Sequence, residues 1–243
     1  MDDTGDVLAR ARSAGVQDLL VAGVDPEGWR SQLALAGNGV HIALGLHPWQ
    51  VAQTPDTWCR DLEGLLEAPP SPIAAIGETG LDFGSRMDPD QFGAQEAAFT
   101  MHLQLADAYG LPLVLHVVSA HSRVVEILAS AAPLRAGGMV HAFSGSREQA
   151  QQYLRLGLHI SICGSVTDPK RRKLRRAVAS IPPDRLLVET DSPDQTPLNR
   201  RPDPNEPAFL IDVIAAVAEV RGDSPRSVAE QTTHNAKTLF QIL

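Results

Sequence analysis

The sequence lacks several features that would assign it to an obvious class of protein. Its apolar runs stop after about six residues, well short of the ~18 that a membrane-spanning helix needs. The N-terminal Met-Asp-Asp-Thr-Gly-Asp is acidic and does not show the basic-then-apolar pattern of a signal peptide. The two cysteines, Cys59 and Cys163, form no metal-binding or redox motif. These absences predict a reduced, cytoplasmic protein without a membrane anchor.

Positive charge is also scarce. The formal net charge of −8 argues against tight, non-specific binding to nucleic acid, because such binding depends on neutralising phosphates. Six of the 21 basic residues nevertheless lie within residues 170–176. Two interpretations stay open for this stretch, a solvated helix face and a surface that faces phosphates. In the second case Arg171 and Arg172 are candidate substrate-binding residues.

Short apolar runs alternate with helical patterns along the whole chain, which is typical of buried parallel strands and their connecting helices. Gly110 predicts the end of one helix, and Ser146 with Gln149 predicts a capping box at the start of another. Strands are expected at 17–24, 41–46, 73–77, 112–116, 138–142, 158–163 and 186–190. Helices are expected at 6–14, 26–37, 56–67, 90–109, 121–130, from Ser146 to Gly157, 169–179, 206–220 and 225–241.

This alternation predicts an α/β protein with the fold of a (β/α)8 TIM-type barrel. A length of 243 residues suits one such barrel or two small domains, and we expect a single domain over residues 1–243. Eight strands would close a barrel, whereas the pattern provides seven and opens on a helix, so the first strand is expected to be missing. A doubly wound open sheet is the competing architecture.

Four possible metal ligands, two imidazoles and two carboxylates, each follow one of the apolar runs. Their spacings of 38, 25 and 50 residues (116−78, 141−116 and 191−141) leave room for strand–helix units between them. Strand C-termini open onto one face of a barrel, where the chemistry takes place. Such a donor set suits a hard-to-borderline divalent cation. The predicted ligands are Glu78, His116, His141 and Asp191.

The motifs resemble those of the TatD family of metal-dependent deoxyribonucleases, within the amidohydrolase-type barrels. The resemblance covers nearly the whole chain, in the order of the family. It is carried by Gly45–Pro48 (GLHP), Ala75–Asp82 (AIGETGLD), Leu111–His116 (LPLVLH), Val140–Gly145 (VHAFSG), Ile162–Asp168 (ICGSVTD), Leu187–Pro193 (LVETDSP), Asn205–Ala208 (NEPA) and Thr233–Phe240 (THNAKTLF).

The resemblance implies hydrolysis of DNA phosphodiester bonds, as an exonuclease on single-stranded ends, with Mg²⁺ or Mn²⁺ expected and Zn²⁺ as the alternative. It places the metal ligands on the four residues above. Asp191 and Glu78 are expected to take part in catalysis. His47, His121, Arg171 and Arg172 are expected to bind the substrate, and the protein is expected to be a monomer.

Two departures from the family pattern bear on function. Many members begin with a His-x-His pair that supplies further ligands, and this sequence has none before its first helix. Val118-Ser119 stands where the family often has Arg-Asp. Two other functions therefore stay open, a hydrolase of another small ester or amide and a non-catalytic relative.

Overall fold

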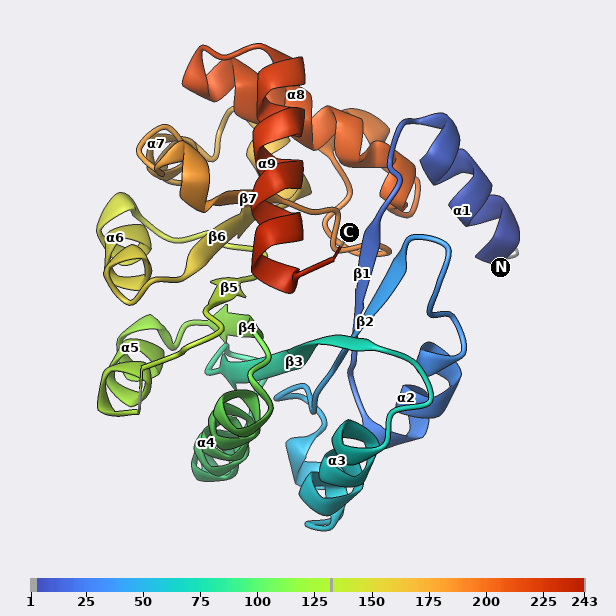
Figure 1. Ribbon diagram of the computed structural model, residues 1–243. Helices are drawn as coiled ribbons and strands as arrows, with labels where there is room; N and C mark the ends of the chain where they lie inside the picture. The colour runs from blue at the N-terminus through green and yellow to red at the C-terminus, as the bar shows by residue number, and fades with distance from the viewer. Residues whose placement is uncertain (1–3, 132, 243) are drawn as a thin grey trace. The chain divides into compact units, whose positions relative to one another are not determined.

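A computed structural model describes residues 4–131 and 133–242. Within these residues the chain forms seven strands that alternate with helices (Figure 1). The alternation confirms the predicted α/β class, and the count matches a (β/α)8 barrel pattern with one strand fewer than eight. The strands are β1 (Leu19–Ala22), β2 (Val40–Leu44), β3 (Ile73–Asp82), β4 (Leu113–Val118), β5 (Gly138–Val140), β6 (His159–Ile162) and β7 (Leu186–Val188).

The helices agree with the predicted segments to within a few residues at each end. They are α1 (Thr4–Ser13), α2 (Pro26–Leu33), α3 (Trp58–Glu67), α4 (Phe92–Tyr109), α5 (His121–Ser130), α6 (Arg147–Arg155), α7 (Arg172–Val178), α8 (Leu210–Arg221) and α9 (Pro225–Phe240). Short 3-10 turns are η1 (Val51–Gln53), η2 (Pro89–Gln91), η3 (Gly164–Thr167), η4 (Pro183–Arg185), η5 (Leu198–Arg200) and η6 (Pro207–Phe209). None of the helices described is both long and apolar enough to cross a membrane.

Two local signals are confirmed at helix ends. Gly110 ends α4 in the left-handed conformation, with φ 65°, which glycine adopts without steric cost. The capping box also forms, because Ser146 N–H donates to Gln149 Oε1 (2.8 Å) and Gln149 N–H donates to Ser146 Oγ (3.3 Å). The basic helix α7 begins later than residue 169, because Asp168 Oδ1 accepts Lys170 N–H in a turn (2.8 Å).

The chain divides into two compact units. The first unit, built mainly from Leu20–His141, contains β1 to β5 as neighbours in that order. The pairs from β2 to β5 are parallel, and α4 packs against β3 (Figure 1). Its core consists of fully buried aliphatic side chains, among them Ile42, Leu44, Ile76, Leu113 and Leu115.

The second unit, mainly Ala142–Arg155 and His159–Thr238, contains the parallel pair β6 and β7. Helix α7 packs against both α6 and α8. Asn235 of α9 donates to the carbonyls of Pro183 (2.7 Å) and Leu186 (2.8 Å), and these bonds fix α9 to the start of β7. That residues 1–243 form a single domain stays a prediction.

Candidate metal centre

Two of the predicted ligands lie inside strands rather than at their ends, so the predicted ends of these strands are wrong. β3 continues past Glu78 to Asp82, and β4 continues past His116 to Val118. The two strands pair on both sides of Glu78, with Gly80 opposite His116. Glu78 and His116 interrupt the apolar runs of β3 and β4, while backbone pairing continues beyond both residues.

A bulge in β3 sets the direction of Glu78. Ile76 lies opposite Leu113 and Thr79 lies opposite Leu115, so β3 contains one more residue than β4 over this stretch. An extra residue of this kind leaves the regular ladder and redirects the side chain beside it. The bulge therefore takes Glu78 out of the simple alternation of a strand.

Close backbone contacts bring His47 to Glu78. A Cβ atom on Gly45 would lie 2.7 Å from the backbone of Gly77, so no larger residue fits there. Beyond this contact, Gly23 N–H donates to Gly77 O (3.1 Å) and Glu78 N–H donates to Gly23 O (2.9 Å). The segments that follow β1 and β2 thus converge on the middle of β3.

A buried histidine on α4 fixes the residue before His47. His102 Nε2 accepts the Leu46 N–H at 3.0 Å, while its Nδ1 donates to Ala98 O at 2.7 Å. Burial lowers the pKa of His102 to about 4, so the ring is neutral and its tautomer is defined by these two bonds. The Trp58 ring stacks on it, with centroids 4.6 Å apart.

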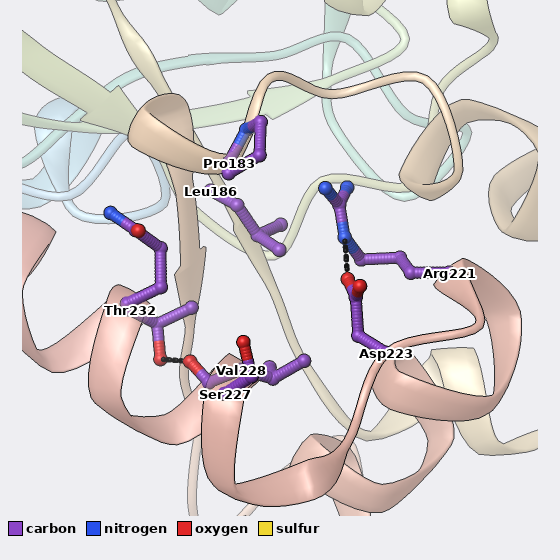
Figure 2. Close-up of a pocket in the computed structure, with 8 residues that line it drawn as sticks. Pro183, Leu186, Arg221, Asp223, Ser227, Val228 and Thr232 are labelled. Carbon is purple, nitrogen blue, oxygen red and sulfur yellow. Dashed lines mark hydrogen bonds and ion pairs between the residues drawn. The ribbon is translucent and has the colours of Figure 1, made fainter.

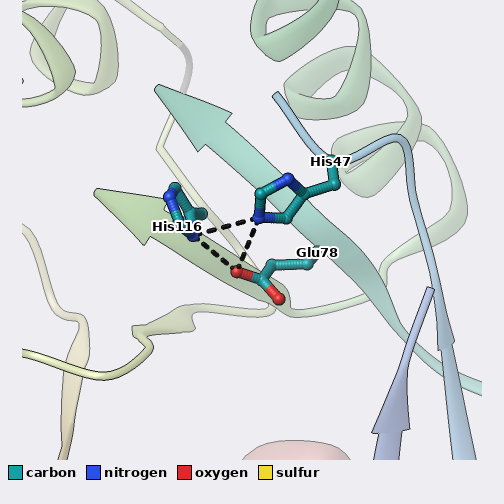
Figure 3. Close-up of side chains that lie close together, drawn as sticks. All are labelled: His47, Glu78 and His116. Atoms are coloured by element: carbon teal, nitrogen blue, oxygen red, sulfur yellow. Dashed lines mark hydrogen bonds and ion pairs between the residues drawn. The ribbon is translucent and has the colours of Figure 1, made fainter. Parts of the chain in front are cut away.

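Three imidazoles converge on one oxygen of Glu78 (Figure 3 shows His47 and His116). Glu78 Oε1 lies 2.8 Å from His116 Nδ1, 3.4 Å from His47 Nε2 and 3.4 Å from His141 Nε2. His47 Nε2 and His116 Nδ1 are 3.1 Å apart. Three of the four predicted ligands, Glu78, His116 and His141, therefore lie together with His47.

The charges at the cluster favour an ionised carboxylate. Burial raises the pKa of Glu78, but the charge of His141 and hydrogen bonds from His116 and His47 outweigh it and bring that pKa well below its ordinary value. Burial lowers the pKa of His47, so this ring is neutral near pH 7. The pKa of His116 is raised, because contacts with Asp82 and Glu78 exceed the opposing effect of burial. An ionised carboxylate thus lies beside neutral or titratable imidazoles.

Asp82 and Trp49 form a second layer behind His116. Asp82 Oδ2 lies 3.4 Å from His116 Nε2 and accepts a 2.6 Å hydrogen bond from Trp49 Nε1. Asp82 Oδ1 accepts Gly84 N–H (2.8 Å), which fixes the turn that follows β3. Against the effect of burial, these hydrogen bonds lower the pKa of Asp82 to about 2. Trp49 was not predicted from the sequence, although its place directly after His47-Pro48 was a signal.

His47 differs from the other imidazoles in the partner of its second ring nitrogen. Its Nδ1 accepts the backbone N–H of Trp49 at 3.2 Å. A neutral imidazole that accepts at one nitrogen carries its proton on the other, so His47 presents Nε2–H to the cluster. This makes His47 a hydrogen-bond donor there through one nitrogen only, whereas both ring nitrogens of His116 face carboxylates, Nδ1 toward Glu78 and Nε2 toward Asp82.

The remaining predicted residues lie elsewhere in the chain. His121 opens α5 and is half-buried. Arg171 and Arg172 are exposed at the start of α7, and Asp191 follows β7, all in the second unit. In that unit Glu189 accepts a hydrogen bond from Ala142 N–H. Metal binding by Asp191 and substrate binding by His121, Arg171 and Arg172 stay predictions.

A hollow of about 100 Å³ in the second unit is a feature of packing (Figure 2). Substrate pockets usually measure roughly 300–1,000 Å³. The guanidinium of Arg221 beside it is already bonded to the carbonyls of Val178 (3.0 Å) and Ile181 (2.8 Å) and to Asp223 (3.1 Å). The lining residues are Pro183, Leu186, Arg221, Asp223, Ser227, Val228, Gln231 and Thr232.

Known proteins resemble this chain over nearly its full length. The family model described as TatD related DNase matches residues 1–241. The 3'-5' ssDNA/RNA exonuclease TatD of Klebsiella pneumoniae (strain 342) is 38% identical over 247 residues, covering 99% of this chain and 92% of that protein. The uncharacterized metal-dependent hydrolase YjjV of Escherichia coli (strain K12) is 37% identical over 239 residues, covering 97% and 90%. The crystal structure of the Escherichia coli protein superposes with a TM-score of 0.93 at 34% identity, covering 98% and 92%.

Proposed function

The chain belongs to the TatD family of deoxyribonucleases, and from this membership we propose that it hydrolyses DNA phosphodiester bonds with a divalent metal ion. The proposal extends to its mode of action, an exonuclease on single-stranded ends. One observation carries the assignment of the site, namely the buried Glu78 oxygen within 2.8–3.4 Å of three imidazole nitrogens.

The donor set fits a divalent cation. Glu78 is ionised, and His116 turns one ring nitrogen toward it while the other faces a carboxylate. A carboxylate behind a ligating histidine orients the ring and raises its basicity. We propose Glu78, His116, His141 and Asp191 as ligands, the last on the family motif alone. Mg²⁺ or Mn²⁺ is the proposed ion and Zn²⁺ the alternative.

When bound, the ion would lower the pKa of a water molecule and offset charge that builds up on the phosphoryl group. The chain contributes the remaining chemistry. Asp191, acceptor-only when ionised, is the proposed acceptor for the proton of the attacking water. His47 would donate its Nε2–H to a phosphate oxygen, because its other nitrogen is engaged by Trp49 N–H.

The substrate strand is proposed to be guided by exposed cations. Arg171 and Arg172, at the start of α7, would contact phosphates outside the reacting bond. His121, at the start of α5, is proposed as a further contact. With a net charge of −8 the whole protein repels nucleic acid at long range, so binding of the strand should be weak and sensitive to salt.

We also propose a monomer in the cytoplasm. Cys59 and Cys163 are both free thiols, which suits a reducing compartment.

A nuclease assay tests the function directly. Single strands labelled at the 5′ or the 3′ end, and the matching duplex, are incubated with the protein and added Mg²⁺ or Mn²⁺, with and without chelator. We expect stepwise shortening of the single strand that chelator abolishes. Cleavage that survives complete removal of metal would refute the proposal.

A further inference from the structure

Trp49 is a half-exposed indole beside the cluster. Its side chain is 47% exposed, whereas Trp29 and Trp58 are 1% and 5% exposed. The Trp49 ring centroid lies 4.7 Å from that of His47 and 5.9 Å from that of His116, both in edge contact. A large aromatic surface is thus exposed to solvent directly beside the predicted metal ligand His116 and beside His47.

The ring is also held in place. Trp49 Nε1 donates to Asp82 Oδ2 at 2.6 Å, and its backbone N–H donates to His47 Nδ1 at 3.2 Å. The exposed Arg86 places its guanidinium carbon over the Trp49 ring, 5.9 Å from the ring centroid, so a stacking base would share the ring with Arg86 or displace it. An exposed indole fixed at its polar edge loses little conformational entropy when a flat group stacks on it. Aromatic rings next to cations are the usual platform for unpaired bases.

We propose that Trp49 stacks on the base next to the scissile phosphate, with Arg86 beside it contacting the strand. This inference rests on the proposed nuclease function and specifies its substrate as an unpaired nucleotide. In a duplex the faces of an internal base are covered by its neighbours and a terminal base is held by its pair, so a base can settle freely on the Trp49 ring only where the strand is unpaired. Stacking tolerates every base, because each one has a π-face, so the platform selects single strands without selecting sequence.

Fluorescence tests the contact without turnover. Trp29 and Trp58 are buried, so quenching by a bound strand reports mainly on Trp49. In chelator, an oligothymidylate should quench the emission, and a strand with abasic sugars at its 3′ end should quench it much less. Trp49→Phe should lose the response. Equal quenching by both strands, or equal quenching in Trp49→Phe, would overturn the proposal.

Two substitutions separate stacking from support of Asp82. Trp49→Phe keeps an aromatic face and loses the Nε1 donor, while Trp49→Leu loses both. The readout is kcat/KM for an oligonucleotide divided by kcat/KM for the same strand with abasic sugars at its 3′ end, which offers no base to stack. We expect this ratio to fall about tenfold in Trp49→Leu and to stay within about threefold of wild type in Trp49→Phe.

A ratio unchanged in Trp49→Leu would show that Trp49 acts only through Asp82, and the stacking proposal would be wrong. If the wild-type protein hydrolyses neither substrate, the proposed function fails. The fluorescence experiment then still decides whether Trp49 binds an unpaired base.

Discussion

His116 Nε2 lies 3.4 Å from Asp82 Oδ2, on the side of the ring away from Glu78. The Asp82 carboxylate thereby orients the imidazole so that Nδ1 meets Glu78 Oε1 at 2.8 Å. Trp49 and Gly84 in turn fix Asp82 with hydrogen bonds of 2.6 and 2.8 Å. Asp82 is therefore expected to influence metal binding although it is not among the proposed ligands.

Replacing Asp82 with Asn should weaken metal binding by about 10- to 100-fold, because the amide cannot supply the charge that orients and polarises His116. Isothermal titration with Mn²⁺ measures the effect, and circular dichroism checks the fold. Asp90→Asn, an exposed change in the same unit, is the matched control. Wild-type affinity in a folded Asp82→Asn protein would show that Asp82 has no such influence.

His141→Ala and Asp191→Ala should each lower metal-dependent hydrolysis at least about a hundredfold while the fold persists, since loss of a ligand should cost no less than loss of its support. His141 Nε2 lies 3.4 Å from Glu78 Oε1, and Asp191 follows β7. Steady-state rates and bound metal are measured on the same samples. Normal turnover with normal metal content in either variant would exclude that residue as a ligand.

Changing both Arg171 and Arg172 to Gln should weaken binding of a single strand and lower the slope of log affinity against log salt by about 1.4, or ~0.7 for each phosphate that is no longer neutralised. Arg175 is left unchanged because it donates to Glu219 (2.7 Å) and to Val166 O (3.0 Å). Fluorescence anisotropy in chelator at several salt concentrations gives the slope. Arg226→Gln, an exposed change on α9, is the control, and an equal effect there would argue against a specific contact.

His102 should make the metal-free protein less stable in acid. Burial lowers its pKa from 6.5 to about 4, so between these values the unfolded chain binds the proton more readily than the folded one. Stability from this group is complete above pH 6.5 and is lost as the pH falls, by about 3 kcal/mol near pH 4.

Urea unfolding in chelator at several pH values measures this loss. In His102→Gln the pH dependence should be shallower than in wild type, while the exposed His234→Gln serves as the control. An identical pH dependence in wild type and His102→Gln would show that His102 does not carry the effect.

The sequence predicted the elements well where a residue pattern has one physical solution. Gly110 adopts the left-handed conformation that ends a helix without steric cost, and Ser146 with Gln149 caps the start of a helix. Both of these predicted helix boundaries are therefore correct. Glu78 shows where such reasoning fails. The strand that holds Glu78 continues to Asp82. The bulge in β3 and the close packing of Gly45 against Gly77 involve neighbouring strands, which periodicity along one segment cannot show.

The candidate ligands were predicted from residue types at strand ends. The second layer behind them, formed by Asp82 and Trp49, was not predicted. Nothing in the local pattern around Trp49 or Asp82 reveals that they share a hydrogen bond across 33 positions. The role of His47 as a donor depends on the Trp49 N–H at its Nδ1, which is a matter of ring orientation. Pairwise geometry of this kind arises from tertiary packing, so it became visible only in the structure.

Metal content and turnover of Glu78→Gln, measured on the same sample, test the central claim most directly. Glu78 Oε1 is the atom on which His47, His116 and His141 converge, and the amide keeps its size but removes its charge. Glu96→Gln, which alters a carboxylate paired with Arg123 at 2.6 Å on α4, is the matched control. We predict that Glu78→Gln loses both bound Mn²⁺ and cleavage of single-stranded DNA while the control retains both. Full metal content together with wild-type cleavage in Glu78→Gln would contradict this claim.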